Sequence, residues 1–192
     1  MRRIAGVALG VTTLVVGTLA GSTASSATPS GPTQTPRTGA SDSGSWPPWI
    51  PYEQEDVTYP AGVYCEFEVF AEVLRDREFF RDVTTYPDGS PRIQLWRGPL
   101  VLRFTNTETG FSVDRNASGR AFMEYGPDEE FQAITIQAGH FVGGMRAGSD
   151  PSQGIFYTSG RWSTLVRHAD GRSTLRPGPN GATENLCDTL DR

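Results

Sequence analysis

The chain contains no lysine, so all 17 of its basic side chains are arginines. This absence excludes enzymes that depend on a Schiff-base lysine, a P-loop lysine or a Ser-x-x-Lys nucleophile. The formal net charge is -5 and the pI is about 5.1. Because nucleic-acid binding requires a basic surface, we expect no nucleic-acid partner.

Histidine and cysteine are scarce, with two of each among the 192 residues. Their spacing matches no zinc motif, and we expect neither a metal site nor a cofactor. A Gly-x-Ser-x-Gly nucleophile elbow is also missing, which argues against a serine hydrolase of that kind. The composition therefore favours a non-catalytic protein over an enzyme, without excluding an enzyme.

No apolar run is long enough to predict a membrane span. The most apolar stretch, Ile4 to Leu19, follows Met1-Arg2-Arg3 and precedes small residues that end at Ala27. This order is typical of a cleaved signal peptide over residues 1–27. We therefore expect a secreted, extracellular protein that keeps no membrane anchor after cleavage.

Residues 28–60 are rich in Pro, Ser and Thr and predict a disordered tether. Near its end lies Trp46-Pro47-Pro48-Trp49-Ile50-Pro51-Tyr52, a stiff polyproline-like segment with three aromatic rings. One interpretation is a ligand for a proline-binding groove or a strip that rests on cell-wall sugar. The other is a spacer whose rings pack back on the domain.

Residues 61–192 carry the pattern of an all-β domain, because apolar residues alternate with polar ones and turn signals recur at short intervals. We expect a single antiparallel β-barrel or β-sandwich of about 8 strands. A short C-terminal helix is expected within 182–190, capped by Thr183. Strands are expected near 63–73, 78–86, 92–97, 100–104, 111–113, 121–125, 134–136, 155–158, 162–167 and 173–176.

Cys65 and Cys187 are the only cysteines, one near each end of this domain. Two cysteines in an oxidising compartment predict a disulfide. The bridge would leave no free thiol for catalysis and would bring the two ends of the domain together.

Three sequence segments resemble a group of small secreted actinobacterial proteins. They are Tyr64-Cys65-Glu66-Phe67, the turn Thr105-Asn106-Thr107-Glu108-Thr109-Gly110, and Asn116-Ala117-Ser118-Gly119. A cysteine closes the chain near its end in these proteins, as Cys187 does here. The resemblance covers roughly residues 61–190 and implies a shared β fold, but no activity and no catalytic residue.

Candidate acid–base groups are few and lack a known motif. His140 lies beside Gly139 and before Gly143-Gly144, which predicts a bent loop where a ligand could approach. His168 is expected at a hairpin tip. The acidic residues Glu66, Glu68 and Glu72 of the first strand, and the run Asp128-Glu129-Glu130, are expected to be solvated rather than catalytic.

Two functional hypotheses remain open, of which we favour the first, and a purely structural role in the cell envelope is the fallback. The first is a monomeric, non-catalytic module that binds a small apolar molecule, a cell-wall glycan or an extracellular protein through Trp96, Trp162 and His140. Trp162 would lie on the same face of its expected strand as Thr164 and Val166. A position in the core is therefore the alternative to a binding role for this residue. The second is a small β-barrel enzyme of cyclase, isomerase or hydrolase type that uses an interior acid or His140. A cavity holding a buried, pKa-shifted group would favour the second.

Overall fold

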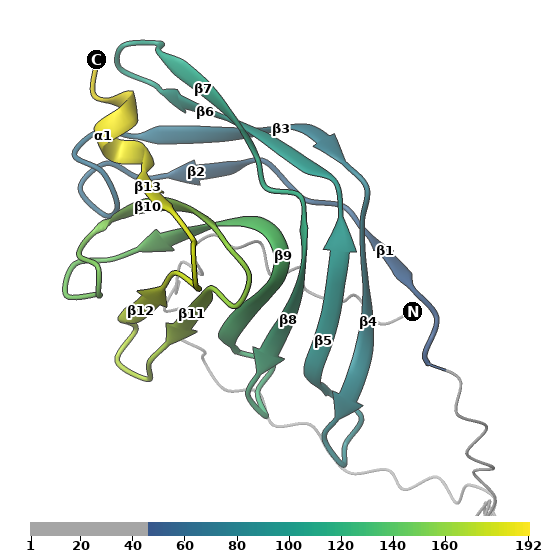
Figure 1. Cartoon of the computed structure of the whole chain (residues 1–192). Helices are drawn as coiled ribbons and strands as arrows, with labels where there is room; N and C mark the ends of the chain where they lie inside the picture. The colour runs from purple at the N-terminus through teal and green to yellow at the C-terminus, as the bar shows by residue number, and fades with distance from the viewer. Residues whose placement is uncertain (1–45) are drawn as a thin grey trace, which may run out of the picture. The chain divides into compact units, whose positions relative to one another are not determined.

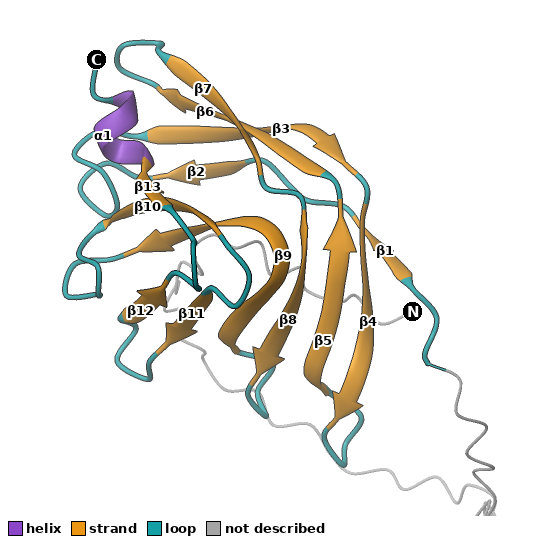
Figure 2. Ribbon diagram, viewed as in Figure 1, coloured by secondary structure: helices purple, strands orange, loops and turns teal. Residues whose placement is uncertain are grey.

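A computed structural model describes residues 46–192 (Figures 1 and 2). The expected signal peptide over 1–27 and most of the expected tether lie outside the described residues. The elements are β1 (Ile50–Tyr52), β2 (Val57–Tyr59), β3 (Val69–Asp76), β4 (Glu78–Thr85), β5 (Pro91–Gly98), β6 (Leu100–Asn106), β7 (Ser112–Asn116), β8 (Gly119–Tyr125), β9 (Phe131–Met145), β10 (Gly154–Ser159), β11 (Thr164–Arg167), β12 (Ser173–Arg176), β13 (Thr183–Asn185) and α1 (Leu186–Leu190).

The strands form two antiparallel sheets. The larger has the order β1-β4-β5-β8-β9-β10-β13, with β11 paired to both β9 and β12. The smaller has the order β2-β3-β6-β7. The sheets do not close on one another, so the expected all-β fold is confirmed as a sandwich rather than a barrel. Short strands of three or four residues raise the number above the expected 8.

Successive strands pass from one sheet to the other around a shared corner (Figure 1). The chain crosses between β3 and β4, between β5 and β6, and again between β7 and β8. Across the larger sheet this corner contains three directly paired glycines, Gly98, Gly119 and Gly139. We call them the glycine row. A Cβ on Gly139 would lie 2.2 Å from the carbonyl oxygen of Ser118, so the backbones approach here more closely than any side chain allows.

The hairpins form where turn residues predict them. In the β4–β5 turn, Gly89 adopts a φ of 89°, and the Asp88 carboxylate accepts hydrogen bonds from the backbone and hydroxyl of Ser90. In the β6–β7 turn, Asn106 Oδ1 accepts from the backbone of Glu108 at 2.9 Å. These local side-chain contacts explain why the hairpin positions follow from sequence.

The folded domain begins before residue 61. Ile50–Tyr52 and Val57–Tyr59, inside the segment assigned to a disordered tether, form β1 and β2. Trp49 lies between two guanidinium groups, with its ring centroid 4.4 Å from Cζ of Arg81 and 3.9 Å from that of Arg97. The composition prediction was wrong here, because strand pairing and cation–π contacts with distant residues order this polar segment.

Two other local expectations were wrong. The strand expected over 63–73 begins only at Val69, because residues 60–68 form turns that bring Cys65 toward the C-terminus. His140 does not lie in a loop. It lies within β9, a 15-residue strand whose first part pairs with β8 and whose last part pairs with β10. The bend expected from the glycines occurs at Gly139 without ending the strand.

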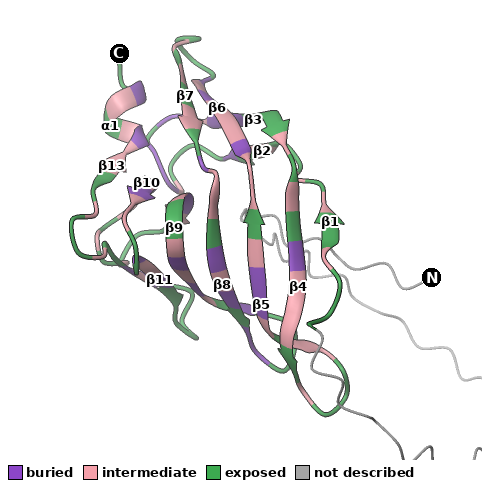
Figure 3. Cartoon of the chain, turned by 45° about the vertical axis from the view of Figure 1, so that its right-hand side comes forward, coloured by how far each residue is buried: buried purple, intermediate pink, exposed green. Residues whose placement is uncertain are grey.

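Buried and exposed positions follow one another along β4, β5 and β8 (Figure 3). The apolar core that the buried residues form divides into two clusters. One gathers residues of both sheets and of α1, including Val69, Phe104 and Leu186. The other lies under β8, β9 and the β11–β12 hairpin, and includes Ile136 and Leu175. A cavity lined by residues of both clusters lies between the sheets.

The disulfide prediction is confirmed, with Cys65 bonded to Cys187 and their Cα atoms 5.3 Å apart. The C-terminal helix is also confirmed, but it spans Leu186–Leu190. Its cap is Asn185, whose Oδ1 accepts from the backbone of Cys187 at 3.1 Å. Thr183 is not the cap, because it pairs with Thr158 in the sheet.

Candidate functional site: a cavity between the two sheets

The cavity has a volume of about 80 Å³ for the centres of water-sized molecules. This is room for several waters, since one water needs roughly 10–15 Å³ on that measure. Its walls are mainly apolar, and both sheets contribute. The apolar lining residues are Val57, Ala71, Leu100, Leu102, Ala117, Ala121, Met123, Ile134, Ile136, Phe141 and Val142.

The acidic part of the lining comes from the corner at β1 and β4. Tyr52 of β1 pairs directly with Glu78 of β4, and both side chains line the cavity. Burial first, and then the negative charge of Asp76, raises the pKa of Glu78 to about 7. Glu78 is therefore a half-protonated carboxyl near neutral pH, set against apolar walls.

Asp76 holds this corner together through its backbone contacts. Its Oδ2 accepts a hydrogen bond from the backbone of Gln54 at 2.6 Å, and its Oδ1 accepts from the backbone of Glu78 at 2.8 Å. One carboxylate thus fastens the segment between β1 and β2 to the first residue of β4. This fixes the backbone from which Glu78 projects.

An aromatic group stands beside Glu78. The Trp96 ring stacks on Phe80 with centroids 5.1 Å apart, and Tyr52 meets it at 4.8 Å in an edge arrangement. The indole N–H donates to Gln94 Oε1 at 3.0 Å, and Gln94 in turn donates to Asp82. Trp96 is therefore held in place on β5, where it lines the cavity.

Burial raises the pKa of the tyrosines around the cavity as well. For Tyr52 the further causes are the carboxylates of Glu78, Glu55 and Asp76. For the fully buried Tyr59, Tyr64 adds to the effect of burial. These hydroxyls stay protonated at neutral pH and can donate hydrogen bonds.

His140 lines the cavity from β9, directly after Gly139, whereas Glu78 lies on β4 beside Gly98, at the other end of the glycine row. Its ring stacks on Tyr157 with centroids 5.2 Å apart and an interplanar angle of 13°. The Tyr157 hydroxyl donates to the backbone oxygen of Asn116 at 3.1 Å. The sequence-based candidates His140 and Trp96 thus meet at one cavity; their role in binding stays a prediction.

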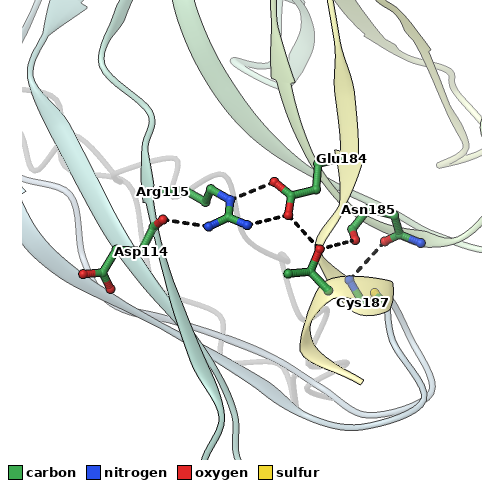
Figure 4. A network of polar contacts seen from close by, with 6 residues as sticks. Asp114, Arg115, Glu184, Asn185 and Cys187 are labelled. Atoms are coloured by element: carbon green, nitrogen blue, oxygen red, sulfur yellow. Dashed lines mark hydrogen bonds and ion pairs between the residues drawn. The ribbon is translucent and has the colours of Figure 1, made fainter. Parts of the chain in front are cut away.

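A polar network ties β7 to β13 and α1 near Tyr157 (Figure 4). Arg115 Nε and Nη2 donate to the two carboxylate oxygens of Glu184 at 2.7 and 2.5 Å. Thr189 donates to the same carboxylate. The hydrogen bonds from Arg115 lower the pKa of Glu184 and keep it charged. The network joins the smaller sheet to the C-terminal elements.

Trp162 does not reach the cavity. It has a φ of 67°, lies in the turn before β11 and is 49% exposed. The guanidinium of Arg161 lies over its ring at 5.0 Å. The core position predicted for Trp162 from its alternation with Thr164 and Val166 was wrong. Trp162 lies in a turn, where the alternation of a strand does not apply.

The carboxylates singled out from sequence lie elsewhere. Glu66 and Glu72 are exposed, and the run Asp128-Glu129-Glu130 forms the exposed β8–β9 turn. His168 lies at the β11–β12 hairpin tip, where its Nε2 is 2.8 Å from Thr174 Oγ1. Sequence reasoning missed Glu78 because it opens a strand of the form Glu-Phe-Phe, in which either face could be the buried one.

Within residues 46–192, no group of three or more His, Cys, Asp or Glu side chains is placed to hold a metal ion. Over the same range, no helix has the length and apolar character needed to cross a membrane.

Comparison of the chain with protein-family models, with curated proteins and with solved structures finds no match. The cavity is therefore the feature of the molecule that points to a function. Its geometry offers apolar contact along most of the wall and a single desolvated carboxyl beside two aromatic rings. Such a site can enclose a small molecule and exchange a proton or an ionic contact with it.

Proposed function

We propose that this is a secreted protein that binds a small, mainly apolar molecule in the cavity between its sheets. The observation that carries the proposal is the apolar lining from both sheets, with the Trp96 ring held at the wall by its bond to Gln94. Apolar pockets with few polar groups are the usual form of small-molecule sites. The disulfide Cys65–Cys187 supports secretion, because such bonds persist in oxidising compartments.

The N-terminal aromatic residues favour this cavity over an external sugar-binding strip. Tyr52 packs against Trp96 inside the sheet, and Trp49 lies between Arg81 and Arg97. These two rings are therefore engaged by the domain itself. The spacer interpretation, in which aromatic residues pack back on the domain, agrees with these contacts.

Cavity-filling variants test the proposal with an uncharged fluorescent dye, N-phenyl-1-naphthylamine. Ala121 is buried, lines the cavity and pairs with Trp96, so Ala121→Phe should weaken dye binding by at least about tenfold, or about 1.4 kcal/mol. Ala138→Phe, at an exposed position of the adjacent strand β9, is the matched control. Dye titration followed by fluorescence measures both.

Ala71→Leu, which fills the cavity from the smaller sheet, provides a second variant if Ala121→Phe unfolds. Circular dichroism melting establishes that each variant is folded. Equal dye binding by the wild type and by folded cavity-filling variants would overturn the proposal, as would a wild type that binds no dye.

A second candidate is a proton-transfer enzyme in which Glu78, rather than His140, is the interior acid. Glu78 meets the condition stated from the sequence, a pKa-shifted group in a cavity, but binding stands first because most of the lining is apolar. The observation that favours the enzyme is the pKa of Glu78, about 7, because a general base works best with a pKa near the working pH. The test uses 5-nitrobenzisoxazole, which opens when a base removes its ring proton. We expect Glu78→Gln to abolish any acceleration while His140→Asn retains it; a wild type no faster than free acetate would exclude this activity.

A further inference from the structure

Glu78 lies in the corner between the sheets, and the described part of the chain supplies no counter-ion for it. Tyr52 of β1 pairs with Glu78 on one side. On the other side lies Gly98 of β5, where an added Cβ would be 2.6 Å from the Glu78 Cα. The ion pairs formed by residues 46–192 do not include Glu78. The carboxyl is thus desolvated by its surroundings without being neutralised by them.

The charge that acts on Glu78 is negative. Asp76 precedes it in the chain by two residues, and Glu55 lines the same cavity. The guanidinium of Arg97, one residue before Gly98, is turned to the Trp49 ring. Arg97 lines the cavity, as do Arg120, which pairs with Arg97 from β8, and His140, which follows Gly139 in β9. None of these three is among the causes that set the pKa of Glu78. This corner therefore favours a positive charge.

Aromatic rings complete the environment of a cation. Tyr52 and Trp96 both line the cavity and contact each other at 4.8 Å. Ammonium groups are attracted to the faces of such rings, with Trp the strongest partner, and the attraction grows when water is excluded. A carboxylate next to Trp and Tyr is a combination suited to an organic ammonium group.

We propose that the cavity binds a small organic amine, with its apolar body between the sheets and its ammonium group at Glu78 against Tyr52 and Trp96. This deepens the proposed function and rests on it. The raised pKa of Glu78 agrees with the assignment, because an unpaired buried carboxyl gains most when a cation enters. The apolar walls formed by Leu102, Met123 and Ile136 would contact the rest of the molecule.

Three probes with one apolar body and different charge test this proposal: benzylamine, benzyl alcohol and benzoate. Each displaces the bound dye N-phenyl-1-naphthylamine at about pH 8, where the carboxyl is ionised and the amine still protonated. We expect benzylamine to bind at least about tenfold more tightly than benzyl alcohol, and benzoate to bind most weakly. In Glu78→Gln the advantage of the amine should disappear while the affinity for the alcohol stays unchanged.

The matched control is Glu72→Gln, which removes a carboxylate from an exposed position on β3. It should retain the preference for benzylamine. If the dye binds but the alcohol or benzoate binds as tightly as the amine, or the preference persists in Glu78→Gln, the amine proposal fails and small-molecule binding stands. If the dye does not bind to the wild type, the proposed function itself fails.

Discussion

Glu78 illustrates how a residue acquires its chemistry from its position. Its pKa of about 7 arises mainly from burial and only then from Asp76, whose own carboxylate is used to hold the backbone of Gln54 and Glu78. Removing a carboxyl from water disfavours its charged form, and no ion pair among residues 46–192 compensates here. Ionised Glu78 therefore lowers the stability of the folded state above neutral pH.

This destabilisation predicts how the stability of the protein depends on pH. Because the folded pKa of about 7 exceeds the ordinary 4.5, the folded state holds more protons than the unfolded state between these values, so Glu78 lowers stability as pH rises through them. Glu78→Gln removes this loss. The free energy of unfolding of the Glu78→Gln variant minus that of wild type should increase by at most about 3 kcal/mol from pH 4.5 to pH 7.

Guanidinium-chloride unfolding of both proteins at several pH values measures the difference. Glu66→Gln, which removes the same charge from an exposed position, is the control for net charge. A difference between Glu78→Gln and wild type that does not change with pH would contradict a desolvated carboxyl.

At the scale of elements, the glycine row is what lets the strands turn the corner. Gly98, Gly119 and Gly139 face one another across β5, β8 and β9, and each would place a Cβ within 2.8 Å of neighbouring backbone. Ser118 adds a polar contact, because its hydroxyl accepts from the backbone of Leu100 at 2.9 Å. Corners of this kind place the two inner faces opposite each other and so form the cavity.

Gly139→Ala should therefore be strongly destabilising. It combines a positive φ of 89° with a Cβ 2.2 Å from the Ser118 carbonyl oxygen, and we expect a loss of about 3 kcal/mol or more. Gly171→Ala is the matched control, since its φ is 80° but nothing lies within 4 Å of the new Cβ. That variant should lose only about 1 kcal/mol. Equal losses in chemical unfolding would show that backbone approach at the corner is unimportant.

At the scale of the whole domain, the C-terminal elements are joined to the part of the chain that carries the smaller sheet, both covalently and by polar contacts. The disulfide links residues 122 positions apart, and the Arg115–Glu184 pair connects the smaller sheet to β13. The disulfide also tethers the turns over 60–68 to α1. The open sandwich is thus fastened on the side where its sheets lack mutual strand pairing.

Loss of the Cys65–Cys187 disulfide should lower the stability of the whole domain. A bridge closing so long a loop contributes up to about 5 kcal/mol in the chain-entropy model, so Cys65→Ser/Cys187→Ser should unfold at much lower denaturant. Wild type reduced with dithiothreitol should follow the same curve as the double variant. A loss below about 1 kcal/mol in both would mean that the remaining contacts hold the ends together without it.

Local signals determined much of the fold from the sequence alone. The alternation in β8, the Asp88-Gly89 turn and the single pair of cysteines each depend on neighbours in the chain or on composition, and each prediction was confirmed. Backbone conformation at a turn is chosen by the residues in the turn, so it can be recognised without the rest of the molecule.

Only the tertiary structure decided the site. Whether Glu78 faces water or a cavity depends on its pairing with Tyr52. Pairing with Ser159 of β10 keeps His140 in a strand despite the bend at Gly139. Trp162 became exposed for the same kind of reason, because a turn interrupted the alternation that predicted its burial. Register and burial are set by contacts between segments far apart in the chain, and the desolvation that shifts a pKa exists only after those segments have met.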